Sequence, residues 1–318
     1  MAKTETVDIV YTWVDDAWPG HHAELLQHAQ KPADTNPNRT RDNLGLLRYS
    51  LRSLEPLPAW VGKIHLFTCR PQVPHWLNTA HPQLRIVHHD EIIDPANLPT
   101  FNSFAINSHL HLLPGLSERF IYFNDDMVAR APLNLADFED EDGRLRVFPW
   151  TLWEPRNAEI SNPERTSPWN LAQAHTGALL DRHFNPARRR QLAHSPRLIR
   201  RRDWKRMTET FAEEFAITRA SKFRAANNIV PSIVYPWMLH AEGKAVLESV
   251  SASGIKTAYV PLENFWPVTW NALRKARHPE ARWSTFNDNF GAHPSRVTTW
   301  LASRQLENWF PQASRFEL

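Results

Sequence analysis

The sequence contains a single cysteine, Cys69, and only nine glycines among its 318 residues. One cysteine forms no internal disulfide and supplies no cysteine-rich zinc site, so disulfide-stapled and zinc-finger proteins are excluded. The common glycine-rich phosphate-binding fingerprints are also absent, because neither a GxGxxG nor a P-loop pattern occurs. Cys69 follows the apolar segment IHLFT, and we expect it to be a small buried residue near a strand end.

Long hydrophobic runs are missing as well. No apolar stretch approaches the roughly 20 residues that a membrane-spanning helix needs, and the opening MAKTETVDIVYTW has no signal-peptide core. The chain is therefore predicted to be cytoplasmic, with peripheral contact at the inner face of a membrane left open. Its 42% hydrophobic and 22% charged residues are typical of a globular protein with one large domain or a domain carrying an inserted lobe.

The charge is nearly balanced, since 37 basic and 34 acidic residues give a net +3. Most of the excess lies in the basic tract, residues 182–206, with the sequence RHFNPARRRQLAHSPRLIRRRDWKR. Two interpretations carry equal weight: a solvated helical surface, or a patch for an anionic partner such as a phosphate-rich polymer, a lipid head group or nucleic acid. No recognised nucleic-acid-binding motif occurs, so nucleic acid is not an expected partner.

Apolar segments typical of strands alternate with amphipathic helical segments. Strands are predicted at residues 7–14, 63–68, 84–88, 120–123 and 255–261, and helices at 21–30, 42–55, 101–112 and 294–309. Asp42 is the expected N-cap of its helix, and Val297, Leu301 and Trp309 should share one side of the last helix. The alternation predicts an α/β fold with a mostly parallel sheet. Residues 171–250 are expected to be mainly helical.

Polar side chains follow the predicted strands at the point where each strand ends. They are Asp15 and Asp16, Thr68 to Arg70, His88 to Asp90, and Asn124 to Asp126. Because parallel sheets bind ligands at the carboxyl ends of their strands, we expect these groups to meet at one site. Two adjacent carboxylates after the buried run FIYF are costly unless a cation or a network of sugar hydroxyls meets them.

Four blocks occur in order along most of the chain: DIVYTWVDD; RDNLGLLRYSLRSLE with PAWVGKIHLFTCRPQVPHWL; LPTFNSFAI with FIYFNDDM; and STFNDNFG. Together they resemble the Stealth family of sugar-1-phosphate transferases. The resemblance implies a nucleotide-sugar-binding fold, glycosyltransferase A-like or Rossmann-like, that depends on Mg²⁺ or Mn²⁺. It further implies transfer of a hexose-1-phosphate, often N-acetylglucosamine-1-phosphate, from a UDP-sugar to a hydroxyl of an oligosaccharide or polysaccharide, with release of UMP. Contact with capsule-assembly machinery is left open.

We expect residues 1–154 and 255–318 to form the α/β core and residues 155–254 a mainly helical lobe that completes the site. The family's catalytic positions carry over one at a time. Asp125 and Asp126 match its acidic pair and are the predicted metal ligands. The histidine of its third block matches His175 in AHTGALL, although Gly177 stands where proline is usual. Arg224 in SKFRAANN matches an arginine that would clamp the transferred phosphoryl group.

One predicted substrate-binding residue departs from the family pattern. Asn107, in AINSH, stands where relatives carry the glutamate of AIESH. An asparagine can hold a hydroxyl or a phosphate oxygen but cannot take a proton, so the predicted general base is Asp126 or His175. The full set of predicted substrate-binding residues is Arg41, Asp42, Asn43, Asn102, Asn107, Asn287 and Asp288.

Two other functions stay open. In a metal-dependent glycosyltransferase, the acidic pair would act on the nucleotide diphosphate, the sugar carbon would be attacked, and the released nucleotide would be UDP. In a non-enzymatic protein, the basic tract would hold an anionic polymer.

Overall fold

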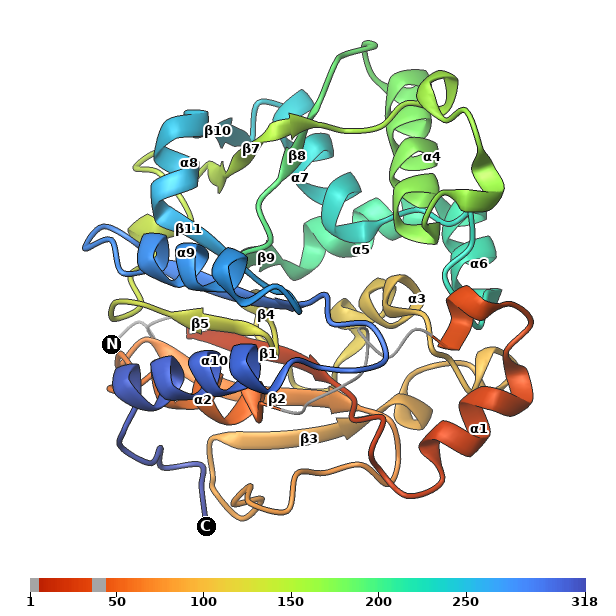
Figure 1. Cartoon of the computed structure of the whole chain (residues 1–318). Helices are drawn as coiled ribbons and strands as arrows, with labels where there is room; N and C mark the ends of the chain where they lie inside the picture. Colours follow the sequence, from red (N-terminus) through yellow and green to blue (C-terminus); the bar gives the residue numbers. More distant parts are fainter. Residues whose placement is uncertain (1–5, 36–43) are drawn as a thin grey trace.

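The computed structural model describes residues 6–35 and 44–318. The strands are β1 (Val7–Trp13), β2 (Val61–Thr68), β3 (Leu84–His88), β4 (Arg119–Asn124), β5 (Met127–Ala129), β6 (Leu145–Val147), β7 (Pro149–Trp153), β8 (Arg190–Leu192), β9 (Arg197–Arg200), β10 (Ala245–Leu247), β11 (Thr257–Leu262) and β12 (Trp283–Asp288). The α-helices are α1 (His21–His28), α2 (Leu46–Ser53), α3 (Ser103–Ser108), α4 (Pro168–His183), α5 (Arg201–Thr210), α6 (Ala212–Ala220), α7 (Pro231–Ala241), α8 (Val250–Lys256), α9 (Trp266–Ala276) and α10 (Arg296–Trp309). Figure 1 shows their arrangement.

The main sheet has the strand order β3-β2-β1-β4-β9. Its first four strands are parallel to one another, and β9 lies antiparallel on the β4 edge. Both faces of β1 and β4 are buried, in agreement with their near-continuous apolar sequences, VDIVYTW and RFIYFN. The predicted α/β fold with a mostly parallel sheet is therefore confirmed.

A second sheet, ordered β11-β12-β5, lies beside the first. Strands β11 and β12 are parallel, and β12 pairs antiparallel with β5. Only Asp125 and Asp126 separate β4 in the main sheet from β5 in the second. This turn therefore joins the two sheets.

Two hydrophobic cores correspond to the two sheets. The larger contains β1 to β4 and the inner faces of α2, α4, α5 and α7, with Trp204 and Tyr235 among its largest buried side chains. The smaller contains Val260, Leu273 and Phe286 under α9 and α10. The described helices include none that is both long enough and apolar enough to cross a membrane.

Several predicted helices differ from the observed ones. Helix α2 begins only at Leu46, because its N-cap is Gly45 in the left-handed conformation (φ 61°). Asp42, the predicted N-cap, lies outside the described residues. In α10 the predicted apolar side is wrong: Leu301 and Trp309 pack against the smaller core, whereas Val297 is half exposed.

Residues 155–254 contain helices α4 to α7, which Figure 1 shows above the main sheet. The same segment contributes three short strands that sequence periodicity did not predict. Strand β8 pairs with β7, β9 with β4, and β10 with β6. The segment is mainly helical, and all three strand pairings tie it to the segment that precedes it.

Candidate functional site

The carboxyl ends of the parallel strands meet at one edge of the main sheet, which we call the polar edge. Trp13 of β1 is paired with Thr68 of β2, and Thr68 with His88 of β3. On the other side, Thr12 of β1 is paired with Asn124 of β4. The predicted convergence of strand ends is confirmed, because all four end at neighbouring positions.

An imidazole lies beside the acidic turn at this edge. His194 follows β8, and its Nδ1 lies 3.8 Å from Oδ2 of Asp126. Its Nε2 lies 3.0 Å from the Asn124 side-chain nitrogen. Since an amide nitrogen donates, Nε2 accepts this bond and the proton of the neutral ring sits on Nδ1, facing Asp126. A carboxylate held against Nδ1 stabilises the imidazolium that forms when Nε2 takes a proton.

The carboxylate of Asp126 is buried, and one of its oxygens has no hydrogen-bond partner among the described residues. Burial raises the pKa of its carboxyl group, and His194 opposes that shift. Its Oδ1 is buried without a hydrogen-bond partner among the described residues. A buried, unbonded carboxylate oxygen with a second carboxylate, Asp125, beside it suits a hard divalent cation. The described residues contain no group of three or more His, Cys, Asp or Glu side chains arranged for a metal.

Strand β12 brings Asn287 and Asp288 to the acidic turn. The backbone amide of Phe286 donates to the carbonyl oxygen of Asp126 at 2.9 Å. Asn287 donates to Asn289 at 2.7 Å, and Asn289 donates to Glu263 at 2.9 Å. The predicted pair therefore ends a strand next to the polar edge. Sequence periodicity did not predict this strand.

Asn107 reaches the polar edge through a tyrosine. The Tyr122 hydroxyl donates to Asn107 Oδ1 at 3.0 Å and is 2.8 Å from the Thr12 hydroxyl. Burial raises the pKa of Tyr122, so the hydroxyl stays protonated and continues to donate. The bond uses the Asn107 oxygen, and the amide nitrogen is a donor that a glutamate at this position would lack.

Arg224 and Asn107 are linked by one face of α3. Arg224 donates from Nε and Nη2 to the Ser103 hydroxyl at 3.2 and 2.7 Å, and its guanidinium lies over Phe104 and Trp169. Because Ser103 and Asn107 are four residues apart on a helix, they project from the same face. Arg224 and Asn107 are thus held on the same side of α3.

Asn102 has a different position. It is fully buried at the N-cap of α3, where its Oδ1 accepts the Phe104 amide at 3.1 Å. Its amide nitrogen donates to Asn228 at 2.8 Å. These bonds give Asn102 a structural role, orienting α3 against the loop that carries Arg224.

His175 lies on α4, where its charged neighbours are Arg182 and Glu214. Burial lowers the pKa of this histidine. The imidazole beside Asp126 is instead that of His194, a residue of the basic tract that is not among the predicted site residues. A signal for it was present: His194-Ser195-Pro196 keeps the proline that is missing after His175. The three remaining predicted residues, Arg41, Asp42 and Asn43, lie outside the described residues.

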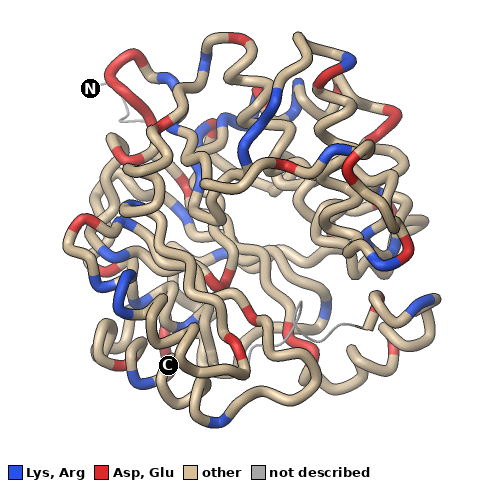
Figure 2. The backbone as a smooth tube through the Cα atoms, turned by 45° about the horizontal axis from the view of Figure 1, so that its top comes forward, with Lys and Arg blue, Asp and Glu red and all other residues tan. Residues whose placement is uncertain are grey.

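The basic tract does not form one continuous cationic patch. It is divided among β8, β9 and α5, and its arginines meet carboxylates from elsewhere. Arg188 pairs with Glu159 at 2.7 Å, Arg189 with Asp181 at 2.6 Å, and Arg206 with Glu242 at 2.6 Å. Figure 2 shows charges of both signs spread along the chain.

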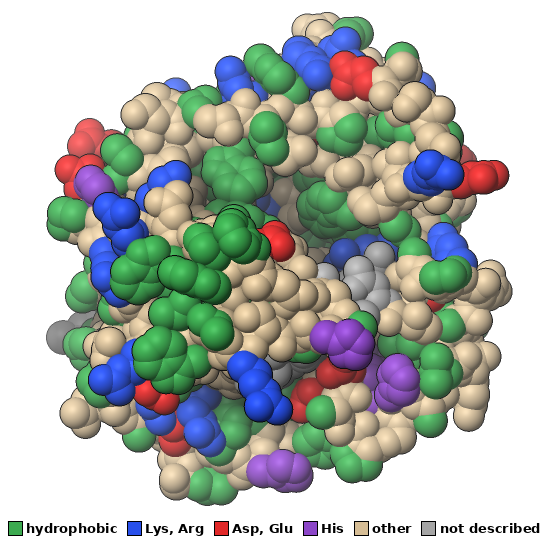
Figure 3. Space-filling model, viewed as in Figure 1, with side chains coloured by type: hydrophobic (Ala, Val, Ile, Leu, Met, Phe, Trp, Pro, Cys, Tyr) green, Lys and Arg blue, Asp and Glu red, His purple; other side chains and the backbone are tan. Residues whose placement is uncertain are grey.

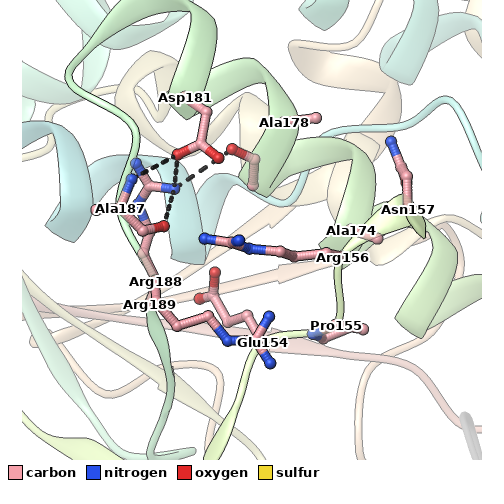
Figure 4. Close-up of a pocket in the computed structure, with 11 residues that line it drawn as sticks. Glu154, Pro155, Arg156, Asn157, Ala174, Ala178, Asp181, Ala187, Arg188 and Arg189 are labelled. Atoms are coloured by element: carbon pink, nitrogen blue, oxygen red, sulfur yellow. Dashed lines mark hydrogen bonds and ion pairs between the residues drawn. The ribbon is translucent and has the colours of Figure 1, made fainter. Parts of the chain in front are cut away.

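A separate cavity of about 140 Å³ opens between α4 and the segments flanking β7 and β8. Figure 4 shows Arg156 reaching across it between Glu154 and Asp181. Glu154 is buried, accepts the Trp237 indole N–H at 3.1 Å, and has its pKa raised to about 7 by burial. The cavity shares no lining residue with the polar edge.

Fold and site together define an α/β protein with an acid–imidazole pair, an arginine and oriented amides at the carboxyl edge of a parallel sheet. The chain belongs to the Stealth family. The family's conserved region 2 matches residues 39–147, and its conserved region 3 matches residues 193–241. Region 2 contains Asn107 and Asp126, and region 3 contains His194 and Arg224 but not His175. The histidine beside Asp126 is therefore the one that lies within region 3.

Named relatives support the membership. An exopolysaccharide phosphotransferase of Streptomyces coelicolor is 37% identical over 98% of this chain and 52% of its own length. A capsular polysaccharide phosphotransferase of Haemophilus influenzae is 33% identical over 76% of this chain and 67% of its own length. The corresponding enzyme of Neisseria meningitidis is 31% identical over 76% and 66%. The chain thus spans about half the length of the Streptomyces relative.

Two solved structures are distantly similar in fold. The galactosyltransferase LgtC, in complex with donor and acceptor sugar analogues, has a TM-score of 0.45 at 10% identity over 97% of this chain and 98% of that one. The bifunctional glycosyltransferase WbbM has a TM-score of 0.48 at 10% identity over 98% and 51%. Similarity at this distance says nothing about substrates.

Proposed function

We propose that this protein transfers a sugar-1-phosphate, such as N-acetylhexosamine-1-phosphate, from a UDP-sugar to a hydroxyl group of a glycan. The product would be a phosphodiester-linked capsular polysaccharide or exopolysaccharide, and the leaving group UMP. The names of the relatives support polysaccharide phosphotransfer. The observation that carries the proposal is the Asp126–His194 pair, which provides a proton acceptor at the polar edge.

The reaction forms one bond and breaks one. The acceptor hydroxyl oxygen bonds to the β-phosphorus, and the bond from that phosphorus to the oxygen bridging toward the α-phosphate breaks. The sugar keeps its own bond to the β-phosphate, and UMP leaves with the bridging oxygen. The hydroxyl proton passes to His194 Nε2, where the acceptor takes the place of the Asn124 amide. Asp126 then stabilises the imidazolium from the Nδ1 side.

Phosphoryl transfer depends mostly on positioning and on neutralising phosphate charge. Arg224, oriented by Ser103, is placed to hold phosphate oxygens. Asn107 presents its amide nitrogen to an acceptor hydroxyl or a phosphate oxygen. Asp125 and Asp126 would hold Mg²⁺ or Mn²⁺, which when bound supplies positive charge against the diphosphate. In this proposal Asn107 does not act as the base, because His194 does.

The decisive experiment identifies the nucleotide product. The protein is incubated with UDP-N-acetylglucosamine, Mg²⁺ and an oligosaccharide primer of sugar-phosphate repeats, with Asp126→Asn as control. Release of UMP by the wild type and its loss in the variant support the proposal. Release of UDP would identify a glycosyltransferase instead. If a panel of UDP-sugars yields no nucleotide product at all, the chain is a binding protein and the proposal fails.

A further inference from the structure

A cluster of large apolar side chains is exposed on one side of the smaller core. The cluster has six members: Phe265 is 68% exposed, Trp300 is 62% exposed, and the other four are between 39% and 50% exposed. Of the thirteen large hydrophobic side chains exposed among the described residues, six belong to this cluster. We call it the aromatic surface; its members are Phe265, Trp266, Val268, Trp270, Val297 and Trp300. Figure 3 shows hydrophobic side chains gathered over α9 and α10, beside a hollow in the same face.

The aromatic surface is continuous because α9 and α10 run side by side in the same direction. At their N-terminal ends, the Ser295 amide donates to the Asn264 side chain at 2.9 Å. At the other end, Arg277 Nε donates to Gln305 Oε1 at 2.9 Å. All six apolar residues therefore lie at or near the N-terminal halves of the two helices, where they form one cluster.

Cations border this cluster. They are Arg274 and Lys275 at the end of α9, and Arg296 and Arg304 on α10, and all four are exposed. Elsewhere arginines meet carboxylates, as Arg52 does with Glu317 at 2.7 Å. The structure records no ion pair between any of these four cations and a described residue. Their charges are therefore available to an anionic partner.

Indole rings beside uncompensated Arg and Lys match the chemistry of a membrane–water interface. Trp and Phe settle at the level of the lipid head groups, and the cations attract anionic lipid phosphates. A second copy of this chain fits less well. A two-fold contact pairs the same patch on both copies, so the cations of one copy would face those of the other.

We propose that the aromatic surface docks the protein on a bilayer that contains anionic lipids. The surface adjoins the polar edge, because Glu263, two residues before Phe265, accepts from Asn289, which in turn accepts from Asn287. Docking would therefore hold the polar edge near the bilayer. Docking would then present a membrane-held glycan acceptor to the site, a consequence that rests on the function proposed above. Lipid binding itself does not depend on that function.

The experiment is co-sedimentation of the full chain with vesicles of phosphatidylglycerol and phosphatidylcholine, compared with phosphatidylcholine alone, in the absence of any sugar donor. The variants are Trp266→Ser/Trp300→Ser and Arg274→Glu/Arg304→Glu. The matched control is Trp153→Ser, because Trp153 on β7 is as exposed as Trp266, at 45% each. Circular dichroism and thermal unfolding verify that each variant folds, since all the substituted side chains are at the surface.

The wild type and Trp153→Ser should bind the anionic vesicles. Both double variants should bind at least about tenfold more weakly, and high salt should weaken wild-type binding. Equal binding by Trp266→Ser/Trp300→Ser and the wild type would overturn the proposal. A second result would also overturn the proposal: the wild type binds no vesicles and forms a dimer in analytical ultracentrifugation, and Trp266→Ser/Trp300→Ser is monomeric. No donor is present, so vesicle binding can succeed even where UMP release fails, and the reverse also holds.

Discussion

His194 approaches Asp126 with its Nδ1 3.8 Å from the carboxylate Oδ2, while its Nε2 meets the side chain of Asn124. Asp126 lies within conserved region 2 and His194 within conserved region 3. The pairing of β9 with β4 brings the two regions together, since His194 lies three residues before the start of β9 and Asp126 two residues after the end of β4. This geometry holds the imidazole in the tautomer that leaves Nε2 able to accept a proton.

Replacing His194 with Gln should lower the rate of UMP release by about 100-fold or more, the usual contribution of a general base. The matched control is His175→Gln, which should keep the wild-type rate because the charged neighbours of His175 are on α4 and α6. Single-turnover release of UMP measures both. Equal losses in the two variants would contradict the assignment of His194 as base.

Asp126→Asn should abolish turnover while making the fold more stable at neutral pH. Burial raises the pKa of this carboxyl group, so its charged form costs stability above that pKa, and the cost disappears as pH falls. An amide carries no such cost, so the urea midpoint of the variant should rise at neutral pH and approach the wild-type value in acid.

The variant Asp126→Asn also tests whether Asp126 is a metal ligand. If Asp126 holds Mg²⁺ or Mn²⁺, adding either ion should raise the wild-type unfolding temperature and leave that of Asp126→Asn unchanged. Glu164→Gln, a change at an exposed glutamate, serves as the control and should respond like the wild type. A full response by Asp126→Asn would exclude this residue as a metal ligand.

Tyr122→Phe should reduce stability by about 1 kcal/mol, the usual net contribution of a hydrogen bond. The substitution also removes the donor that orients Asn107. We therefore expect a rise in the acceptor KM without the large fall in kcat expected for His194→Gln. A double-mutant cycle with Asn107→Ala checks the coupling, because the second change should add little if both residues act through one bond. Strict additivity would show that they act independently.

Glu154→Gln should flatten the pH dependence of stability. Burial raises the pKa of Glu154 from an ordinary value of 4.5 to about 7. Between these pH values the unfolded state loses a proton that the folded state keeps, so wild-type stability falls as pH rises, by up to about 3 kcal/mol. Glutamine still accepts the Trp237 N–H and has no charge to bury. Urea midpoints between pH 4.5 and 7.5 should fall in the wild type and in the exposed control Glu164→Gln, and should fall less steeply in Glu154→Gln, which keeps only the contribution of other groups such as Asp126.

The strands that sequence periodicity predicted are those with strong local signals. β1, β2, β3 and β4 are apolar runs followed by polar residues, and their ends meet as expected. Four of the missed strands, β5, β6, β8 and β10, have three residues each, too few to show a period, and each is paired with a partner strand. β12 ends in Asn287 and Asp288, a pair that is equally typical of a turn.

The site residues, like the strands, fall into those that local sequence patterns predict and those that only the tertiary structure identifies. The sequence by itself determined the α/β class, the acidic turn and the family, because these depend on local patterns and on blocks that stay in order. Only the tertiary structure decided which histidine faces Asp126, that Tyr122 orients Asn107, and that Asn102 caps α3. These roles depend on contacts between residues far apart in sequence. Likewise, Val297 occupies a position that periodicity predicts to be buried, but it is 50% exposed in the structure, so it joins the exposed aromatic surface.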